Sequence, residues 1–199
     1  MSFIINGKYN LTFVHIPKTG GTSITHWADE NKKESSMIWI PDHPWYETVL
    51  EQDKHKNFSF TIVRNPWDRF VSMYFWISGT ECLRLENGKE KFKKLIKNAP
   101  STFELFVTES PKVVNPDYLF TSVTQQNRWI QPGVDLILRY ENFEEDFVKI
   151  RDIFDDCVSP LPHENKTEHK HYREYYDDHT RKLVAKYFEE DIDTFKYQF

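Results

Sequence analysis

Cysteine is scarce in this sequence, which contains only Cys82 and Cys157. Two cysteines provide neither a disulfide framework nor the spacing of a metal site, and this favours a reducing compartment. No apolar run approaches the roughly 18 residues of a membrane span. The first residues also lack the basic region and long apolar stretch of a secretory signal. We therefore expect a soluble, cytoplasmic protein without a membrane span.

Basic residues are not in excess either. The 26 lysines and arginines are outnumbered by 31 aspartates and glutamates, and the formal net charge is −5. Proteins that bind nucleic acids usually show the opposite balance, so we expect no nucleic-acid partner. Aromatic residues, by contrast, make up 16% of the 199 residues. This length fits a single domain over residues 1–199 with a core rich in rings.

Only six glycines occur in the chain, and two of them are adjacent. They lie where a β-favouring run changes to a helix-compatible segment, in the stretch Pro17-Lys18-Thr19-Gly20-Gly21-Thr22-Ser23. Glycine lets the backbone turn tightly against a ligand, and Thr22 and Ser23 can cap the helix that follows. The free N–H groups at a helix N-terminus, with a lysine nearby, suit a phosphate or sulfate. The alternative is a strand-to-helix turn that only needs glycine.

The order of residues in this loop differs from that in ATP- and GTP-hydrolysing proteins. Their lysine follows the last glycine, and the next residue carries a hydroxyl that binds magnesium. Here Lys18 precedes both glycines, and no glycine lies four or five positions before it. The residues therefore predict an anion-binding loop, and they disfavour a nucleotide kinase or NTPase.

Apolar patterns predict strands that alternate with helices. The expected strands cover residues 10–16, 37–40, 58–63 and 134–138. The expected helices cover residues 22–31, 44–52, 66–78, 89–98, 101–109, 141–154 and 170–190. This alternation predicts an α/β fold with a central parallel sheet flanked by helices. Ligands of such sheets bind beyond the carboxyl ends of the strands, where the 17–23 loop and the residues after Val63 would lie.

A second polar motif begins at the end of the expected strand 58–63. It reads Arg64-Asn65-Pro66-Trp67-Asp68-Arg69-Phe70-Val71-Ser72. The guanidinium of Arg64 offers a planar fork to a phosphate, and the hydroxyl of Ser72, two helical turns later, can add a hydrogen bond. The alternative is that Arg64 pairs with a carboxylate such as Asp68, and that Ser72 only packs between helices. The loop at 17–23 favours the phosphate interpretation.

Together the two motifs resemble the nucleotide-binding motifs of sulfotransferases that use 3′-phosphoadenosine 5′-phosphosulfate (PAPS). The closest similarity is to the carbohydrate sulfotransferases of heparan, dermatan and chondroitin chains and to their small bacterial and viral relatives. Residues 138–147, 161–167 and 172–176 resemble later segments of the family. The resemblance implies a P-loop-like sulfotransferase architecture. Residues 80–132 match no family segment, and we expect them to encode acceptor specificity.

The resemblance also implies roles for individual residues. The 5′-phosphosulfate would be bound by Lys18, Thr19, Gly20, Gly21, Thr22 and Ser23, and the 3′-phosphate by Arg64 and Ser72. Lys18 would in addition be catalytic, because it stabilises the leaving phosphate as the S–O bond breaks. His43 resembles the family's catalytic histidine in position and would take the proton of the acceptor hydroxyl. Asp42 and Glu47 are the alternative bases, and a plain surface histidine is the alternative for His43.

The implied reaction moves a sulfuryl group from PAPS to a hydroxyl, with a carbohydrate as the favoured acceptor, and leaves PAP. Two alternatives are a catalytically inactive nucleotide- or glycan-binding module and, less favoured, a P-loop-type nucleotide kinase. The histidines at 163, 169, 171 and 179 match no metal-ligand spacing, so no metal is expected. The lysines between 89 and 97 predict a solvated helix face or, as a second interpretation, a glycan-binding patch.

Overall fold

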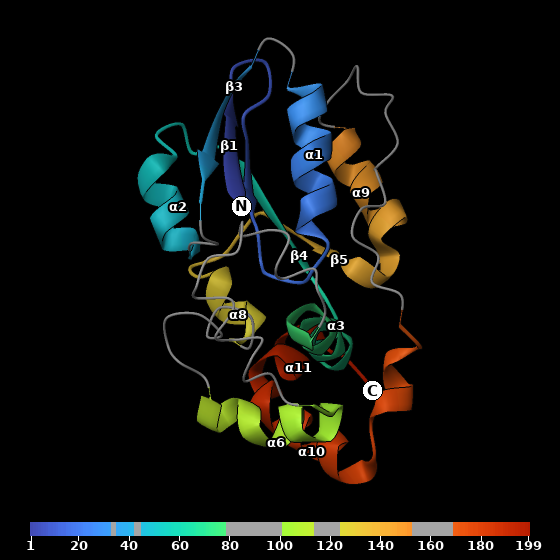
Figure 1. Cartoon of the computed structure of the whole chain (residues 1–199). Helices are drawn as coiled ribbons and strands as arrows, with labels where there is room; N and C mark the ends of the chain where they lie inside the picture. Colours follow the sequence, from blue (N-terminus) through green and yellow to red (C-terminus); the bar gives the residue numbers. More distant parts are fainter. Residues whose placement is uncertain (33–34, 42–44, 79–100, 114–123, 153–168) are drawn as a thin grey trace. The chain divides into compact units, whose positions relative to one another are not determined.

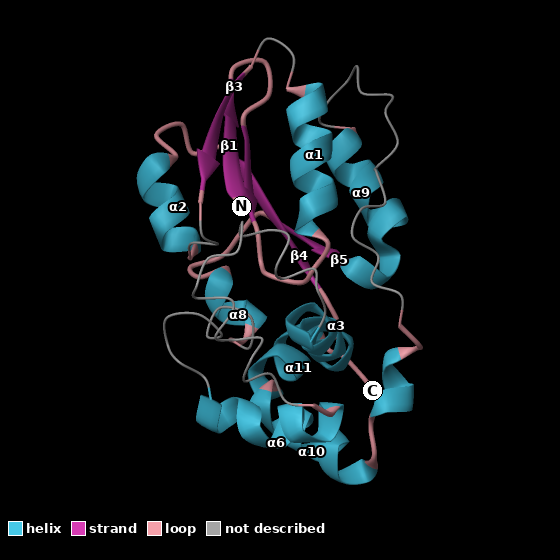
Figure 2. Cartoon of the chain, viewed as in Figure 1, coloured by secondary structure: helices cyan, strands magenta, loops and turns pink. Residues whose placement is uncertain are grey.

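The computed structural model describes residues 1–32, 35–41, 45–78, 101–113, 124–152 and 169–199 (Figures 1 and 2). The chain divides into two compact units. The first contains Met1–Arg64 and Gln125–Lys166, and the second contains Asn65–Thr124 and Thr167–Phe199. Each unit is therefore assembled from segments far apart in the sequence. A single domain over residues 1–199 stays a prediction.

The first unit is built on a five-stranded mixed sheet in the order β3-β1-β2-β4-β5 (Figure 2). Its strands are β1 (Ser2–Asn6), β2 (Leu11–Val14), β3 (Ser36–Ile40), β4 (Phe58–Val63) and β5 (Leu136–Arg139). Strand β4 pairs in parallel with β2 and with β5, whereas β1 is antiparallel to both of its neighbours. The structure thus confirms the α/β class and adds a strand that the sequence pattern did not predict. The chain turns back from β1 into β2 just after Gly7, whose φ of 128° suits glycine.

Helices cover both faces of this sheet. Helices α1 (Gly21–Asn31) and α9 (Phe143–Arg151) pack on one face, and α2 (Tyr46–Gln52) packs on the other (Figure 1). Because side chains alternate along a strand, neighbouring residues of β1 serve different faces: Phe3 joins the α1–α9 core, and Ile4 joins the α2 core. Apolar side chains from these helices therefore pack against both faces of the sheet.

The second unit is helical in its described residues. Its helices are α3 (Pro66–Ser78), α6 (Phe103–Val113), α10 (Asp178–Tyr187) and α11 (Glu189–Phe195), with a 3₁₀ turn η2 (Tyr172–Tyr175). Phe70 of α3 lies at its centre, with ring centroids 4.8 Å from Phe106 and 5.8 Å from Phe188. The bounds of α3 agree with the prediction, because Pro66 fits the first helical turn. The helix predicted at 89–98 lies outside the described residues.

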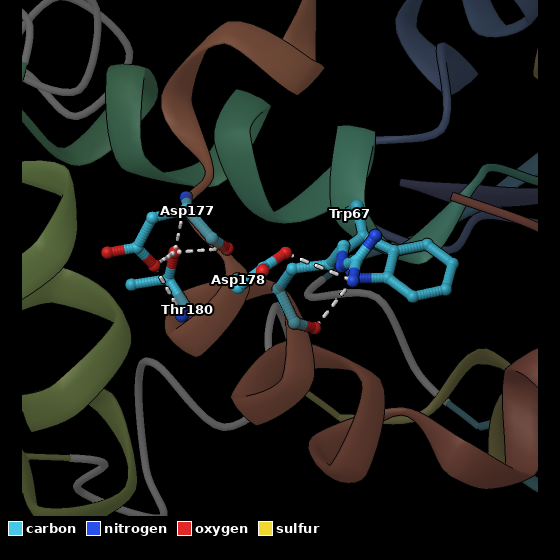
Figure 3. A network of polar contacts seen from close by, with 5 residues as sticks. Trp67, Asp177, Asp178 and Thr180 are labelled. Carbon is cyan, nitrogen blue, oxygen red and sulfur yellow. Dashed lines mark hydrogen bonds and ion pairs between the residues drawn. The ribbon is translucent and has the colours of Figure 1, made fainter.

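The predicted helix over 170–190 is wrong, since η2, α10 and α11 replace it. Asp177 interrupts it by adopting an extended conformation and capping α10. Its carboxylate accepts hydrogen bonds from the hydroxyl and backbone N–H of Thr180, at 2.6 and 2.7 Å (Figure 3). The bond from the Thr180 hydroxyl lowers the pKa of Asp177. In the next turn, the carbonyl of Arg181 accepts a hydrogen bond from Trp67 Nε1 at 3.1 Å, which ties α10 to the start of α3.

Similar interruptions shorten other elements. The helix expected over 141–154 consists of a 3₁₀ turn η1 (Tyr140–Asn142) followed by α9. A four-residue helix, α8 (Gln126–Trp129), precedes β5 and was not predicted. Within the described part of the chain, no helix has the length and apolar character needed to cross a membrane.

Candidate functional site

Three neighbouring parallel strands end at the same edge of the sheet. In the register, Val14 of β2 lies opposite Thr61 of β4, and Val63 of β4 lies opposite Arg139 of β5. The segments that follow are the 17–23 loop after β2, Arg64 after β4 and Tyr140 after β5. The structure therefore confirms that the loop and Arg64 meet at the carboxyl ends of the strands, where α/β proteins bind ligands.

Two residues of the loop after β2 have a left-handed backbone conformation. Lys18 has a φ of 68° and Gly20 a φ of 85°. For Lys18 this conformation is strained, because its Cβ crowds the following carbonyl, whereas Gly20 adopts it freely. Inside the loop, the buried hydroxyl of Thr19 donates a hydrogen bond to the carbonyl of Ile16 at 2.8 Å. That hydroxyl thus holds the turn from within.

The predicted capping of the next helix by Thr22 and Ser23 is wrong. Helix α1 begins at Gly21, and Gly20 is its N-cap, with no side-chain capping bond. Thr22 and Ser23 consequently lie inside the first turn, where a hydroxyl is no longer in the capping position. Ser23 is buried and its N–H donates to the carbonyl of Gly20 at 3.1 Å, whereas Thr22 is half-buried.

Arg64 lies directly against this loop. Its Nη1 donates a hydrogen bond to the carbonyl of Lys18 at 3.2 Å, and only 7% of the residue is exposed. The carbon of its guanidinium lies 4.1 Å from the centre of the Tyr140 ring. The two sequence motifs, 46 residues apart, are therefore joined by a direct contact between Lys18 and Arg64.

The backbone of Arg64 is fixed by a residue that the sequence analysis missed. The side-chain amide of Gln126, which is fully buried, donates to the Arg64 carbonyl at 2.8 Å. Its oxygen accepts from the Arg64 N–H at 2.9 Å. Through these two bonds, the Gln126 side chain pairs with the Arg64 backbone in the way that a neighbouring strand pairs with β4. No local pattern identifies Gln126, because it acts on a residue 62 positions away.

Gly21 approaches the imidazole of His15, a second residue that the sequence analysis left without a role. A Cβ at Gly21 would fall within 3.0 Å of three imidazole atoms of His15. The imidazole is itself confined: it stacks on Phe13, with ring centroids 5.6 Å apart, and only 7% of the residue is exposed. Glycine is therefore required at this position for close packing and not for an unusual φ.

Replacing Gly21 with alanine should destabilise the protein by about 1–3 kcal/mol, the usual cost of overpacking a tight site. The added methyl group must displace the His15 imidazole or the loop. Urea unfolding of wild type and variant measures the change in the free energy of unfolding. In a His15→Ala background the same substitution should cost much less, because the obstacle is gone. An equal cost in both backgrounds would contradict this explanation.

Ser72 belongs to the second unit. It lies in the second turn of α3, and its exposed fraction is 3%. The helix is capped by Asn65, whose Oδ1 accepts from the N–H of Trp67 at 3.1 Å. The hydroxyl of Tyr176 donates to the carbonyl of Trp67 at 2.9 Å, and burial raises the pKa of Tyr176, which keeps that donor protonated. Ser72 thus lies on a helix whose first turn is stabilised by hydrogen bonds with Asn65 and Tyr176.

The candidate bases are His43, Asp42 and Glu47. His43 and Asp42 fall outside the described residues. Helix α2 begins at Tyr46 with Trp45 as its N-cap, so the expected start at residue 44 is corrected. Glu47 is exposed in the first turn of α2. Among the described residues, no group of three or more histidine, cysteine, aspartate or glutamate side chains is arranged to hold a metal ion.

Neither the comparison with curated proteins nor the comparison with solved structures gave a match. The family model described as the sulfotransferase family matches residues 1–198, which is nearly the whole chain. That span includes both motifs and all five strands of the sheet. The chain therefore belongs to the sulfotransferase family.

Proposed function

We propose that this protein transfers a sulfuryl group from PAPS to a hydroxyl, with a carbohydrate as the acceptor. The observation that carries the proposal is the direct contact between the two motifs, in which Arg64 Nη1 bonds the Lys18 carbonyl at 3.2 Å. A single nucleotide with an anionic group at each end needs two cationic sites close together. The choice of PAPS rests on the resemblance of both motifs to those of PAPS-dependent sulfotransferases, and family membership supports it.

The residues present suit a bound phosphosulfate. The loop has no side chain at Gly20 and Gly21, and it leads into the N-terminus of α1, whose first N–H groups and dipole favour an anion. Lys18 is only half-buried and adds a positive charge. We assign the 5′-phosphosulfate to this loop, with Thr19, Thr22 and Ser23 as its hydroxyl residues. The 3′-phosphate is assigned to Arg64 and Ser72.

The chemistry that follows needs a base and a charge-stabilising group. PAPS supplies, when bound, a sulfuryl group attached to a phosphate leaving group. His43 takes the proton of the acceptor hydroxyl, whose oxygen forms a bond to sulfur while the S–O bond to phosphate breaks. The ammonium of Lys18 stabilises the negative charge that develops on the phosphate oxygen. No step in this scheme requires a metal ion.

Two measurements test the proposal. Isothermal titration should show that PAP binds without magnesium, and radiolabelled PAPS should transfer its label to a member of a glycan panel. Absence of PAP binding would overturn the proposal. Binding of PAP without transfer to any acceptor would favour a binding module, and binding that requires magnesium and a γ-phosphate would favour a kinase.

A further inference from the structure

Tyr140 touches both nucleotide motifs, although it belongs to neither. Its ring faces the guanidinium of Arg64, with a distance of 4.1 Å from the guanidinium carbon to the ring centre. The same ring lies against Gly20, where an added Cβ would come within 3.1 Å of its Cδ2 and Cε2. Tyr140 is placed there by the end of β5, the third of the parallel strands that end at this edge.

The guanidinium of Arg64 meets the Tyr140 ring through its carbon centre, which lies over the ring. A guanidinium stacked on a ring uses its flat face, whereas its five N–H donors point outward in the plane. One of these donors, on Nη1, already bonds the Lys18 carbonyl. Stacking on Tyr140 therefore restrains the orientation of the guanidinium plane and does not itself use an N–H donor. A fixed fork loses less freedom when it binds a phosphate than a mobile one.

Three contacts within the first unit connect Arg64, the loop and Tyr140 to one another. Arg64 bonds the carbonyl of Lys18, Gly20 follows two residues later, and the Tyr140 ring packs against Gly20 and back on Arg64. Tyr140 is half-buried and also packs at the edge of the apolar core. The ring therefore contacts the core, the loop and the Arg64 guanidinium together.

We propose that Tyr140 is a positioning residue that orients the Arg64 guanidinium for the 3′-phosphate of the nucleotide. The inference rests on the proposed function, in which Arg64 binds that phosphate. It concerns the ring face of Tyr140 and not its hydroxyl group, because both contacts are made by ring atoms.

The test compares two ligands that differ only in the 3′-phosphate, PAP and adenosine 5′-phosphate (AMP), by isothermal titration. In Tyr140→Leu, PAP affinity should fall about fivefold to twentyfold, the range expected for a partly desolvated cation–π contact. AMP affinity should stay within about twofold, because the loop site is retained. Tyr140→Phe keeps the ring and should bind PAP as the wild type does. Tyr140→Met serves as a second non-aromatic variant if the leucine variant fails to fold.

A double-mutant cycle shows whether Tyr140 acts through Arg64. In an Arg64→Ala background, Tyr140→Leu should cause no further loss of PAP affinity, since the group that it orients is absent. Equal losses for PAP and AMP, or undiminished PAP affinity in both non-aromatic variants, would overturn the inference while the proposed function stands. A wild-type protein that binds no PAP would overturn both.

Discussion

Replacing Lys18 with methionine should lower kcat for sulfuryl transfer by about 10²- to 10³-fold, the usual effect of removing one group that stabilises developing charge. Methionine keeps an unbranched apolar stem and removes the ammonium, with its positive charge and its hydrogen-bond donors. PAP affinity should fall far less than kcat, because charge accumulates on the phosphate oxygen only as the S–O bond breaks. Steady-state kinetics with PAPS, together with titration of PAP, separate the two quantities.

The left-handed conformation of Lys18 provides a matched control for this experiment. Its φ of 68° costs an L-residue roughly 1–2 kcal/mol, a strain that glycine avoids. Lys18→Gly should therefore be as inactive as Lys18→Met. Its midpoint of urea unfolding should nevertheless equal or exceed that of the wild-type protein. If kcat followed stability across the two variants, or stayed near the wild-type value in both, the catalytic assignment of Lys18 would be lost.

Replacing Arg64 with alanine should weaken PAP binding by about 10- to 100-fold, which corresponds to losing a charged hydrogen-bonding partner. AMP has no 3′-phosphate, so its affinity should change little. Isothermal titration of both ligands to wild type and variant measures the difference directly. The loss is specific to one end of the nucleotide because the loop at 17–23 is retained.

Arg64→Lys is the informative companion variant. Lysine keeps the positive charge but lacks the planar fork, and a compact ammonium stacks less well on Tyr140. We expect its PAP affinity to lie between those of the alanine variant and the wild type. Since Arg64 also bonds the Lys18 carbonyl, circular dichroism and thermal unfolding must accompany the titrations. A parallel fall in PAP and AMP affinity would assign Arg64 a structural role only.

Local sequence patterns predicted the elements that carry the site. The β-branched and aromatic run Phe58–Val63 forms β4, and Pro66 opens α3 at the predicted residue. Local patterns failed where a distant partner decides the outcome. The strand β1 forms because β2 and β3 pair with it on either side. The last predicted helix breaks because Asp177 caps α10 through Thr180.

The residues of the candidate site also fall into two groups, those that the sequence pointed to and those that only the structure identified. Lys18, the glycines after it and Arg64 could be found from the sequence, because an anion site needs cations and a bare backbone at strand ends. Gln126, His15 and Tyr140 could not be assigned a role, since each acts through a residue that only folding brings near. Gln126 fixes the Arg64 backbone, His15 fills the space beside Gly21, and Tyr140 stacks on the Arg64 guanidinium.

By itself, the sequence determined which groups we propose to contact an anion, the class of fold that presents them, and a resemblance to the sulfotransferase family that the family model confirms. These properties depend on the types of residue and on their spacing over short stretches, and both can be read directly from the sequence. Tertiary structure alone decided how those groups are held. The parallel pairing of β2, β4 and β5 brings three strand ends together, and Gln126 and Tyr140 then hold Arg64 against the Lys18 loop. The orientation of a charged group is set by the residues that surround it in the folded protein, and the sequence alone does not specify it.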